Sequence, residues 1–195
     1  MDFRITFDRI PEKFDKYRPR YCDELFKEII TVCDLNSSKD VLEIGPGTGQ
    51  ATEPILKTDC NYKAIELGKN FTEYIKKKYE NYSNFHIVND DFETYDFGNE
   101  RFHLIYSAAT IQWITEEIAF AKVYKLLKPG GIFAMFMTRS DEKSANEELY
   151  KMIDDVYKVH LTVRQKYNCK VQYENIVNYG FINYKYQEWK KDKNT

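Results

Sequence analysis

The segment VLEIGPGTGQ constrains this chain more than any other, because it joins a short hydrophobic strand directly to a glycine-rich turn. It spans residues 41–50 and places glycines at Gly45, Gly47 and Gly49. Residues without side chains let a ligand approach the main chain, and they tolerate positive φ angles where a strand turns into a helix. In parallel sheets covered by helices, ligands bind at the carboxyl ends of the strands. The segment therefore predicts a ligand site after the first strand of an α/β sheet.

Strand and helix patterns alternate along most of the chain. We expect strands at residues 40–44, 61–66, 85–88, 102–107 and 132–137, and helices at 20–34, 48–57, 68–80, 115–128 and 144–158. The fifth strand is continuously apolar, as expected when both of its faces are buried. This βαβα order predicts an α/β fold with a doubly wound, mostly parallel sheet and helices on both faces.

The end of the chain is less regular. Residues 160–180 are polar and ambiguous, whereas the aromatic-rich segment 181–189 is predicted to be a sixth strand. With only a short charged tail after it, we expect no seventh strand. The strand at 181–189 would then have an unpaired edge, which favours association between molecules. We expect one domain over residues 1–195, and a monomer or weak homodimer.

Composition excludes several classes of protein. The chain has 43% hydrophobic and 31% charged residues and a net charge of −2, a profile typical of soluble globular proteins. It has no long basic stretch, no apolar run long enough to cross a bilayer and no apolar signal core, so we expect a cytoplasmic protein without a nucleic-acid or membrane partner. The four cysteines and three histidines are scattered, so we expect reduced thiols and no metal site.

The spacing of the glycines narrows the choice of ligand. The dinucleotide fingerprint GxGxxG would require a third glycine at position 50, where the chain has Gln50. Glu43, two residues before Gly45, would repel a pyrophosphate but suits a cationic group such as the amino group of an amino-acid cofactor. A P-loop is excluded because no Lys-Ser/Thr pair follows the glycines. An NAD-dependent oxidoreductase therefore remains only as a disfavoured alternative.

Two further acids follow the next strands. Glu66 ends the second strand, at the position from which an acid commonly accepts hydrogen bonds from ribose hydroxyls. Asp91 and Phe92 follow the third strand, where a carboxylate can accept from an adenine amine and the ring can form an apolar wall. A simple turn at Asn89–Asp91 is the alternative reading. Together, the three acids at successive strand ends indicate a nucleoside lying across the sheet.

These motifs resemble those of the class I S-adenosylmethionine-dependent methyltransferases of the small-molecule type. The resemblance rests on VLEIGPGTGQ, Glu66, Asp91-Phe92, FHLIYSAATIQWI and LLKPGGIFAMF, and it covers residues 14–138. It implies a Rossmann-like methyltransferase fold with S-adenosylmethionine as cofactor and S-adenosylhomocysteine as product. The implied cofactor-binding residues are Glu43, Gly45, Pro46, Gly47, Gly49, Glu66, Leu67, Asp91, Phe92 and Ser107.

Two segments suggest where the acceptor binds. The Gln112-Trp113 pair is similar to one in trans-aconitate and malonyl-carrier-protein methyltransferases, which form methyl esters on carboxylates. The segment KFDKYRPRY resembles the entry helix of the same group, and we expect Tyr17, Arg18 and Tyr21 near the substrate. Trp113 as a core anchor and Arg18-Pro19 as a helix boundary are the structural alternatives.

The expected reaction is transfer of the methyl group to a small-molecule acceptor, with a carboxylate favoured because it needs no general base. No catalytic residue stands out. We expect residues 1–138 to form the cofactor-binding core and 139–195 to supply substrate-covering helices and the last strand. The alternative function is a non-catalytic or incomplete cofactor-binding module.

Overall fold

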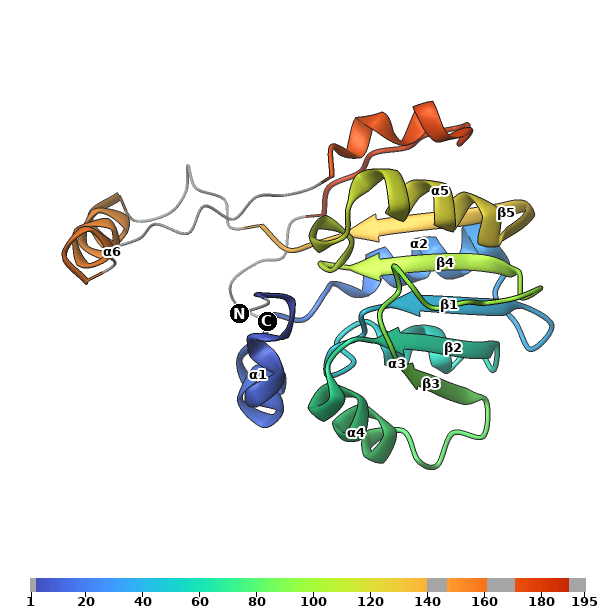
Figure 1. The fold of residues 1–195 in the computed structure, drawn as a ribbon, viewed down its shortest axis with the longest axis horizontal. Helices are drawn as coiled ribbons and strands as arrows, with labels where there is room; N and C mark the ends of the chain where they lie inside the picture. Colours follow the sequence, from blue (N-terminus) through green and yellow to red (C-terminus); the bar gives the residue numbers. More distant parts are fainter. Residues whose placement is uncertain (1–2, 140–146, 161–170, 190–195) are drawn as a thin grey trace.

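The computed structural model describes residues 3–139, 147–160 and 171–189, and a five-stranded parallel sheet lies at its centre (Figure 1). The strands follow the order β3-β2-β1-β4-β5 across the sheet. Their bounds are β1 Asp40–Ile44, β2 Asn61–Glu66, β3 Phe85–Asn89, β4 Phe102–Ala108 and β5 Leu127–Phe136. Each neighbouring pair is parallel. The predicted doubly wound α/β sheet is therefore confirmed.

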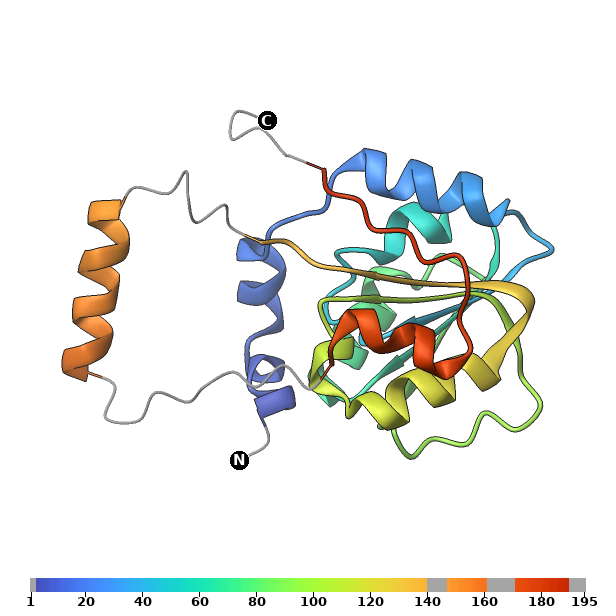
Figure 2. The same ribbon diagram turned by 90° about the horizontal axis from the view of Figure 1, so that it is seen from above.

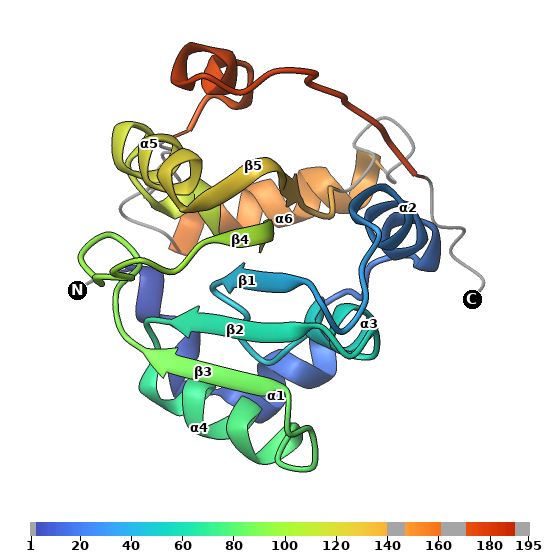
Figure 3. The ribbon, with the colours of Figure 1, turned by 90° about the vertical axis from the view of Figure 1, so that its right-hand side faces the viewer.

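Helices cover both faces of this sheet (Figure 3). One face carries α2 (Asp23–Cys33), α3 (Thr52–Leu56) and α4 (Lys69–Lys78), whose apolar side chains pack on alternate residues of the central strands. The other face carries α5 (Glu116–Leu126) and the 3-10 helix η4 (Tyr173–Tyr179). Because side chains alternate across a strand, Val41 belongs to the first layer and Leu42 to the second.

The chain changes direction across the sheet between β1 and β4. From β1 it builds outwards through β2 and β3, and then returns to place β4 on the other side of β1. Such a switch leaves a crevice at the carboxyl ends of the two central strands. The short helix α1 (Pro11–Tyr17) lies across these strand ends, and α6 (Glu147–His160) stands further from the sheet (Figures 1 and 2).

Several predicted elements need correction. Residues 181–189 form no strand: Asn183 has a φ of 59°, which interrupts the extended chain, and the segment is held by separate contacts of Phe181, Lys185 and Trp189. The predicted helix 48–57 is reduced to α3, because the glycine turn extends into it. The fifth strand begins at Leu127 rather than 132, with an irregular register opposite Phe102 and Leu104.

The other boundaries agree with expectation within a few residues, and β1 and β2 agree at both ends. Within the described residues, β5 pairs only with β4 and forms an edge of the sheet. The absence of a seventh strand stays a prediction, since residues 190–195 lie outside the described part. No described helix is long and apolar enough to span a membrane.

A buried polar network lies beneath the glycine turn. Glu43 is fully buried on the same face as Val41, and its Oε2 accepts hydrogen bonds from Tyr62 Oη and, at 2.6 Å, from Thr52 Oγ1. Tyr62 also hydrogen-bonds to Tyr106, so the network joins β1, β2, β4 and α3. Burial, partly offset by these hydrogen bonds, raises the pKa of Glu43 to about 7.

This raised pKa predicts a pH-dependent stability. Between the ordinary pKa of 4.5 and the native value of about 7, the folded chain retains a proton that the unfolded chain has lost, so stability falls as the pH rises. Because glutamine cannot ionise, wild type is expected to lose about 3 kcal/mol more unfolding free energy than Glu43→Gln between about pH 5 and about pH 8. Urea denaturation at each pH measures the difference.

The matched control is Glu53→Gln, which changes a half-exposed carboxylate on α3. It should follow the wild-type pH profile. Parallel profiles for wild type and Glu43→Gln would show that the buried carboxylate does not titrate in this range.

Candidate functional site

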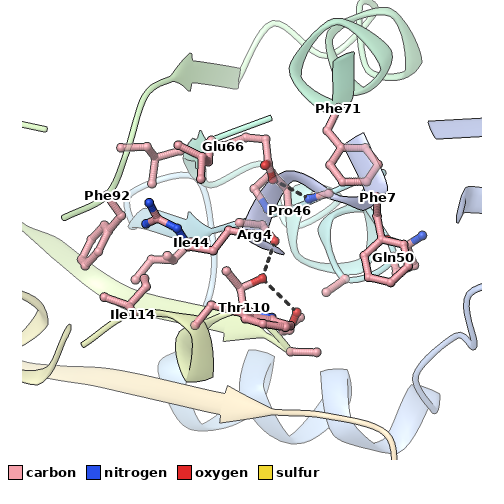
Figure 4. Close-up of a pocket in the computed structure, with 18 of the residues that line it drawn as sticks. Arg4, Phe7, Ile44, Pro46, Gln50, Glu66, Phe71, Phe92, Thr110 and Ile114 are labelled. Carbon is pink, nitrogen blue, oxygen red and sulfur yellow. Dashed lines mark hydrogen bonds between the residues drawn. The ribbon is translucent and has the colours of Figure 1, made fainter. Parts of the chain in front are cut away.

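A cavity of about 310 Å³ opens at the carboxyl ends of the strands, beneath the N-terminal segment (Figure 4). Its walls come from the glycine turn, the end of β2, the loop after β3, the loop after β4 and the segment before α2. The lining residues are Arg4, Phe7, Phe14, Arg18, Tyr21, Ile44, Gly45, Pro46, Gly47, Gln50, Ala51, Ile65, Glu66, Leu67, Phe71, Asp90, Asp91, Phe92, Ala108, Ala109, Thr110, Gln112, Trp113 and Ile114. The cavity therefore lies at the switch point of the sheet.

The glycine turn owes its shape to close packing on both sides. Gly45 has a φ of 67°, and a Cβ there would lie 2.3 Å from Thr110 Cγ2. Gly49 has a φ of 83°, and a Cβ there would lie 2.9 Å from the Tyr79 ring. Side chains at either position would force the turn away from β4 or from α4. The two glycines therefore allow the turn to pack closely against Thr110 and Tyr79.

Glu66 ties the end of β2 to the glycine turn. Its Oε2 accepts a hydrogen bond from Gly47 N at 2.9 Å (Figure 4). Its Oε1 accepts one from Gly68 N at 2.8 Å. The side chain lines the cavity although the residue is only 7% exposed. Burial raises the pKa of Glu66, opposed by these amide hydrogen bonds. Since each carboxylate oxygen has two lone pairs, both oxygens keep capacity for a donor on a ligand.

Asp91 and Phe92 form the wall beyond Glu66. Asp91 Oδ1 accepts from Glu93 N at 2.9 Å, and Oδ2 lies 3.0 Å from Arg4 Nη1. Phe92 is buried and packs against Phe97. The wall thus combines an ion-paired carboxylate with an aromatic surface.

The loop after β4 is held tightly against the glycine turn. Thr110 Oγ1 donates to Gly45 O at 3.0 Å, and Gln112 Nε2 donates to Ala109 O at 2.9 Å. Ala109 has a φ of 55°, which is unfavourable for a residue with a Cβ. Such backbone strain occurs most often at ligand sites. The buried Gln112 Oε1 has no hydrogen-bond partner among the described residues.

Most of the predicted site residues meet at this cavity. Seven of the ten predicted cofactor-binding residues line it, namely Gly45, Pro46, Gly47, Glu66, Leu67, Asp91 and Phe92. So do four of the five predicted substrate residues, namely Arg18, Tyr21, Gln112 and Trp113. Their grouping follows from parallel topology, which brings the carboxyl ends of all strands to one edge.

The other four lie outside the cavity lining. Glu43 points into the layer beneath α3, because strand alternation gives it the same side as Val41. Gly49 packs against Tyr79, and buried Ser107 accepts from Ile111 N at 2.9 Å to shape the loop after β4. Tyr17 is 71% exposed on α1. Glu43, Gly49 and Ser107 therefore do not line the cavity but hold together the elements that form its wall.

Sequence reasoning missed several residues of the N-terminal segment, above all Arg4. This residue lies in the 3-10 helix η1 (Phe3–Ile5) and reaches across the cavity toward Phe92 (Figure 4). Phe7 and Phe14 also line the cavity, in ring contact at a centroid distance of 5.4 Å. Phe14 lies within the segment KFDKYRPRY, whereas no local motif marks Arg4 or Phe7. The only signal was the aromatic and basic content of the segment.

The lining of the cavity fits an adenosyl cofactor in its chemistry. Ile65 and Phe92 supply apolar walls that suit a base, and the Glu66 carboxylate supplies acceptors that suit ribose hydroxyls. The glycine turn supplies main chain without side chains at the other end. Among the described residues, no group of three or more His, Cys, Asp or Glu side chains is arranged to hold a metal ion.

Comparison with known proteins gives consistent matches. Residues 42–135 match the methyltransferase domain family. A malonyl-[acyl-carrier protein] O-methyltransferase of Marinomonas is 28% identical over 138 residues, covering 69% of this chain and 50% of that protein. A sterol 24-C-methyltransferase of Clavispora lusitaniae is 29% identical over 154 residues, covering 76% of this chain and 41% of that protein. The chain thus spans about half or less of the length of these two relatives.

Among solved structures, the CcbJ methyltransferase from Streptomyces caelestis is similar with a TM-score of 0.56. It is 22% identical and the match covers 66% of this chain and 55% of that chain, which supports the fold. The family match lies on the same strands and turns that build the cavity. From β1 to β5, the chain thus matches a methyltransferase domain, and its resemblance to S-adenosylmethionine-dependent methyltransferases is confirmed.

Proposed function

We propose that the chain transfers a methyl group from S-adenosylmethionine to a small-molecule acceptor, and that the acceptor atom is a carboxylate oxygen. The observation that carries the proposal is the position of Glu66, which lines the cavity and is held between the Gly47 and Gly68 amides. Two ribose hydroxyls would donate to the Glu66 oxygens, with the base between Ile65 and Phe92. The family match over residues 42–135 supports the same cofactor.

The chain's own residues have mainly to orient the reactants. The sulfonium of S-adenosylmethionine supplies a methyl group that is already activated, so alignment and exclusion of water suffice. The N-terminal segment covers the cavity through Phe7 and Phe14, and Trp113 and Ile114 close its other side. A carboxylate acceptor is ionised at neutral pH and requires no base. None of the described residues that line the cavity is a histidine, which agrees with that acceptor.

Arg18 supports the choice of a carboxylate. Its guanidinium lies 5.6 Å from the Phe14 ring centroid, at the cavity, and forms no salt bridge among the described residues. Arginine binds carboxylates through two parallel hydrogen bonds. The similarity to a malonyl-[acyl-carrier protein] O-methyltransferase points to the same acceptor class. Arg18 would thus hold the acceptor while Gln112 and Trp113 shape its surroundings.

The proposal is tested with methyl-labelled S-adenosylmethionine and a panel of carboxylic acids, phenols and amines. We expect label in carboxylic-acid products only, and release of that label as methanol after mild base, because methyl esters hydrolyse where ethers and methylamines do not. Label confined to base-stable products would contradict the carboxylate acceptor. Cofactor binding without transfer to any compound would instead favour the non-catalytic binding module.

Arg18→Ala provides the matched test of the acceptor site. We expect the KM for the active acid to rise roughly tenfold or more, as for loss of a charge-assisted hydrogen bond, with Arg18→Lys intermediate. Affinity for S-adenosylhomocysteine should change little. Lys13→Ala removes an exposed charge from α1, the helix that Arg18 directly follows, and should behave as wild type.

Glu66→Gln tests the cofactor site. The amide can accept only through one atom, and its NH₂ group would face a main-chain N–H donor. We expect affinity for S-adenosylhomocysteine to fall roughly tenfold to a hundredfold, as for a lost hydrogen bond to a charged group. Calorimetric titration measures the change, and the exposed Glu73→Gln on α4 serves as control. Equal affinities of wild type and Glu66→Gln would remove Glu66 from the site.

A further inference from the structure

Arg4 occupies the side of the cavity where the base of the cofactor is proposed to lie. Its Nη1 lies 3.0 Å from Asp91 Oδ2 and 2.9 Å from Glu93 Oε2. All three side chains are largely buried, with 25% of Arg4, 23% of Asp91 and 18% of Glu93 exposed. Arg4 therefore joins the N-terminal segment to the loop after β3. In Figure 4, its guanidinium points toward Phe92 on that loop.

The segment that carries Arg4 is docked firmly at a second place. Asp8 Oδ1 accepts from Phe71 N at 2.8 Å, Asp8 Oδ2 accepts from Asn70 N at 3.3 Å, and Asn70 Nδ2 donates to Asp8 O at 3.0 Å. Gly68 precedes α4 and has no side chain that could cap this helix. Asp8, from a distant part of the chain, therefore accepts hydrogen bonds from the first N–H groups of α4. Aromatic contacts of Phe14 with Phe7 and Phe71 add to this docking.

Both oxygens of Asp91 are already engaged. Oδ1 accepts from Glu93 N at 2.9 Å, and Oδ2 faces the Arg4 guanidinium. An adenine amine that donates to Asp91 Oδ2 would compete there with a charged donor, the Arg4 guanidinium. Glu93 is also held by another hydrogen bond, because its Oε1 accepts one from Thr115 N, at the start of α5, at 3.3 Å. Glu93 can therefore keep its position when Asp91 changes partner.

We propose that Arg4 is a latch that competes with the cofactor for Asp91. Without cofactor, Arg4 closes the cavity by pairing with Asp91 and Glu93 together. Cofactor binding breaks the pair with Asp91, leaves Arg4 on Glu93 and frees Asp91 to accept from the base. The ion pair thus lowers cofactor affinity, because part of the binding free energy goes into breaking it. This inference rests on the proposed function, which places the adenine at Asp91.

The test is calorimetric titration of S-adenosylhomocysteine into wild type, Arg4→Ala and Arg9→Ala. A partly exposed ion pair is worth up to roughly fivefold in binding, so we expect Arg4→Ala to bind the ligand roughly two- to fivefold tighter than wild type. Arg9→Ala removes an exposed charge from the same segment, in η2 (Phe7–Arg9), and should match wild type. Added salt should narrow the difference between wild type and Arg4→Ala, since it screens the ion pair.

Glu93→Gln gives an independent variant that leaves both Arg4 and Asp91 in place. It removes the charged partner on which Arg4 stays when the cofactor binds, so Arg4 leaves Asp91 at a greater cost, and Glu93→Gln should bind the ligand more weakly than wild type. Unchanged or weaker binding by Arg4→Ala, with wild type binding normally, overturns the latch while the proposed function stands. If Arg4→Ala binds S-adenosylhomocysteine and wild type does not, the result also supports the latch, because the ion pair then prevents binding altogether. Binding by none of the variants overturns the proposed function, and the latch with it.

Discussion

The site depends on one carboxylate that joins two strands. Glu66 accepts hydrogen bonds from Gly47 N and Gly68 N, so the turn after β1 and the turn after β2 are fixed to the same side chain. A buried carboxylate is costly unless it is hydrogen-bonded, and here the main chain provides the donors. The same side chain lines the cavity, and each of its oxygens has a further lone pair. The interaction that shapes the turns therefore also prepares the acceptors for a ligand.

The three acids at successive strand ends have three different environments. Glu43 faces the helical layer and belongs to the Tyr62–Tyr106 network, Glu66 lies at the cavity wall, and Asp91 is paired with Arg4. Similar positions in the sequence therefore do not imply similar roles. Whether an acid can contact a ligand depends on the strand face that it occupies and on the residues that cover that face.

The core of the fold was predictable because its signals are local. The hydrophobic runs of β1 and β2 end in glycine, acidic or polar residues, and these local signals predict both ends of each strand. Parallel topology then places Glu66 and Asp91 at one edge of the sheet. The segment 181–189 was misread, because its aromatic pattern resembles a strand although its residues make separate contacts with two layers. Arg4 was not predictable, since its partners lie 87 and 89 residues away in the sequence.

A crystal structure of the chain with S-adenosylhomocysteine tests the proposed site most directly. We predict the ribose hydroxyls on the two oxygens of Glu66, the base against Phe92 and the amino-acid end over the glycine turn at Gly45 and Gly47. A ligand bound with its ribose away from Glu66, or outside the cavity between β1 and β4, would contradict the assignment of this cavity as the cofactor site.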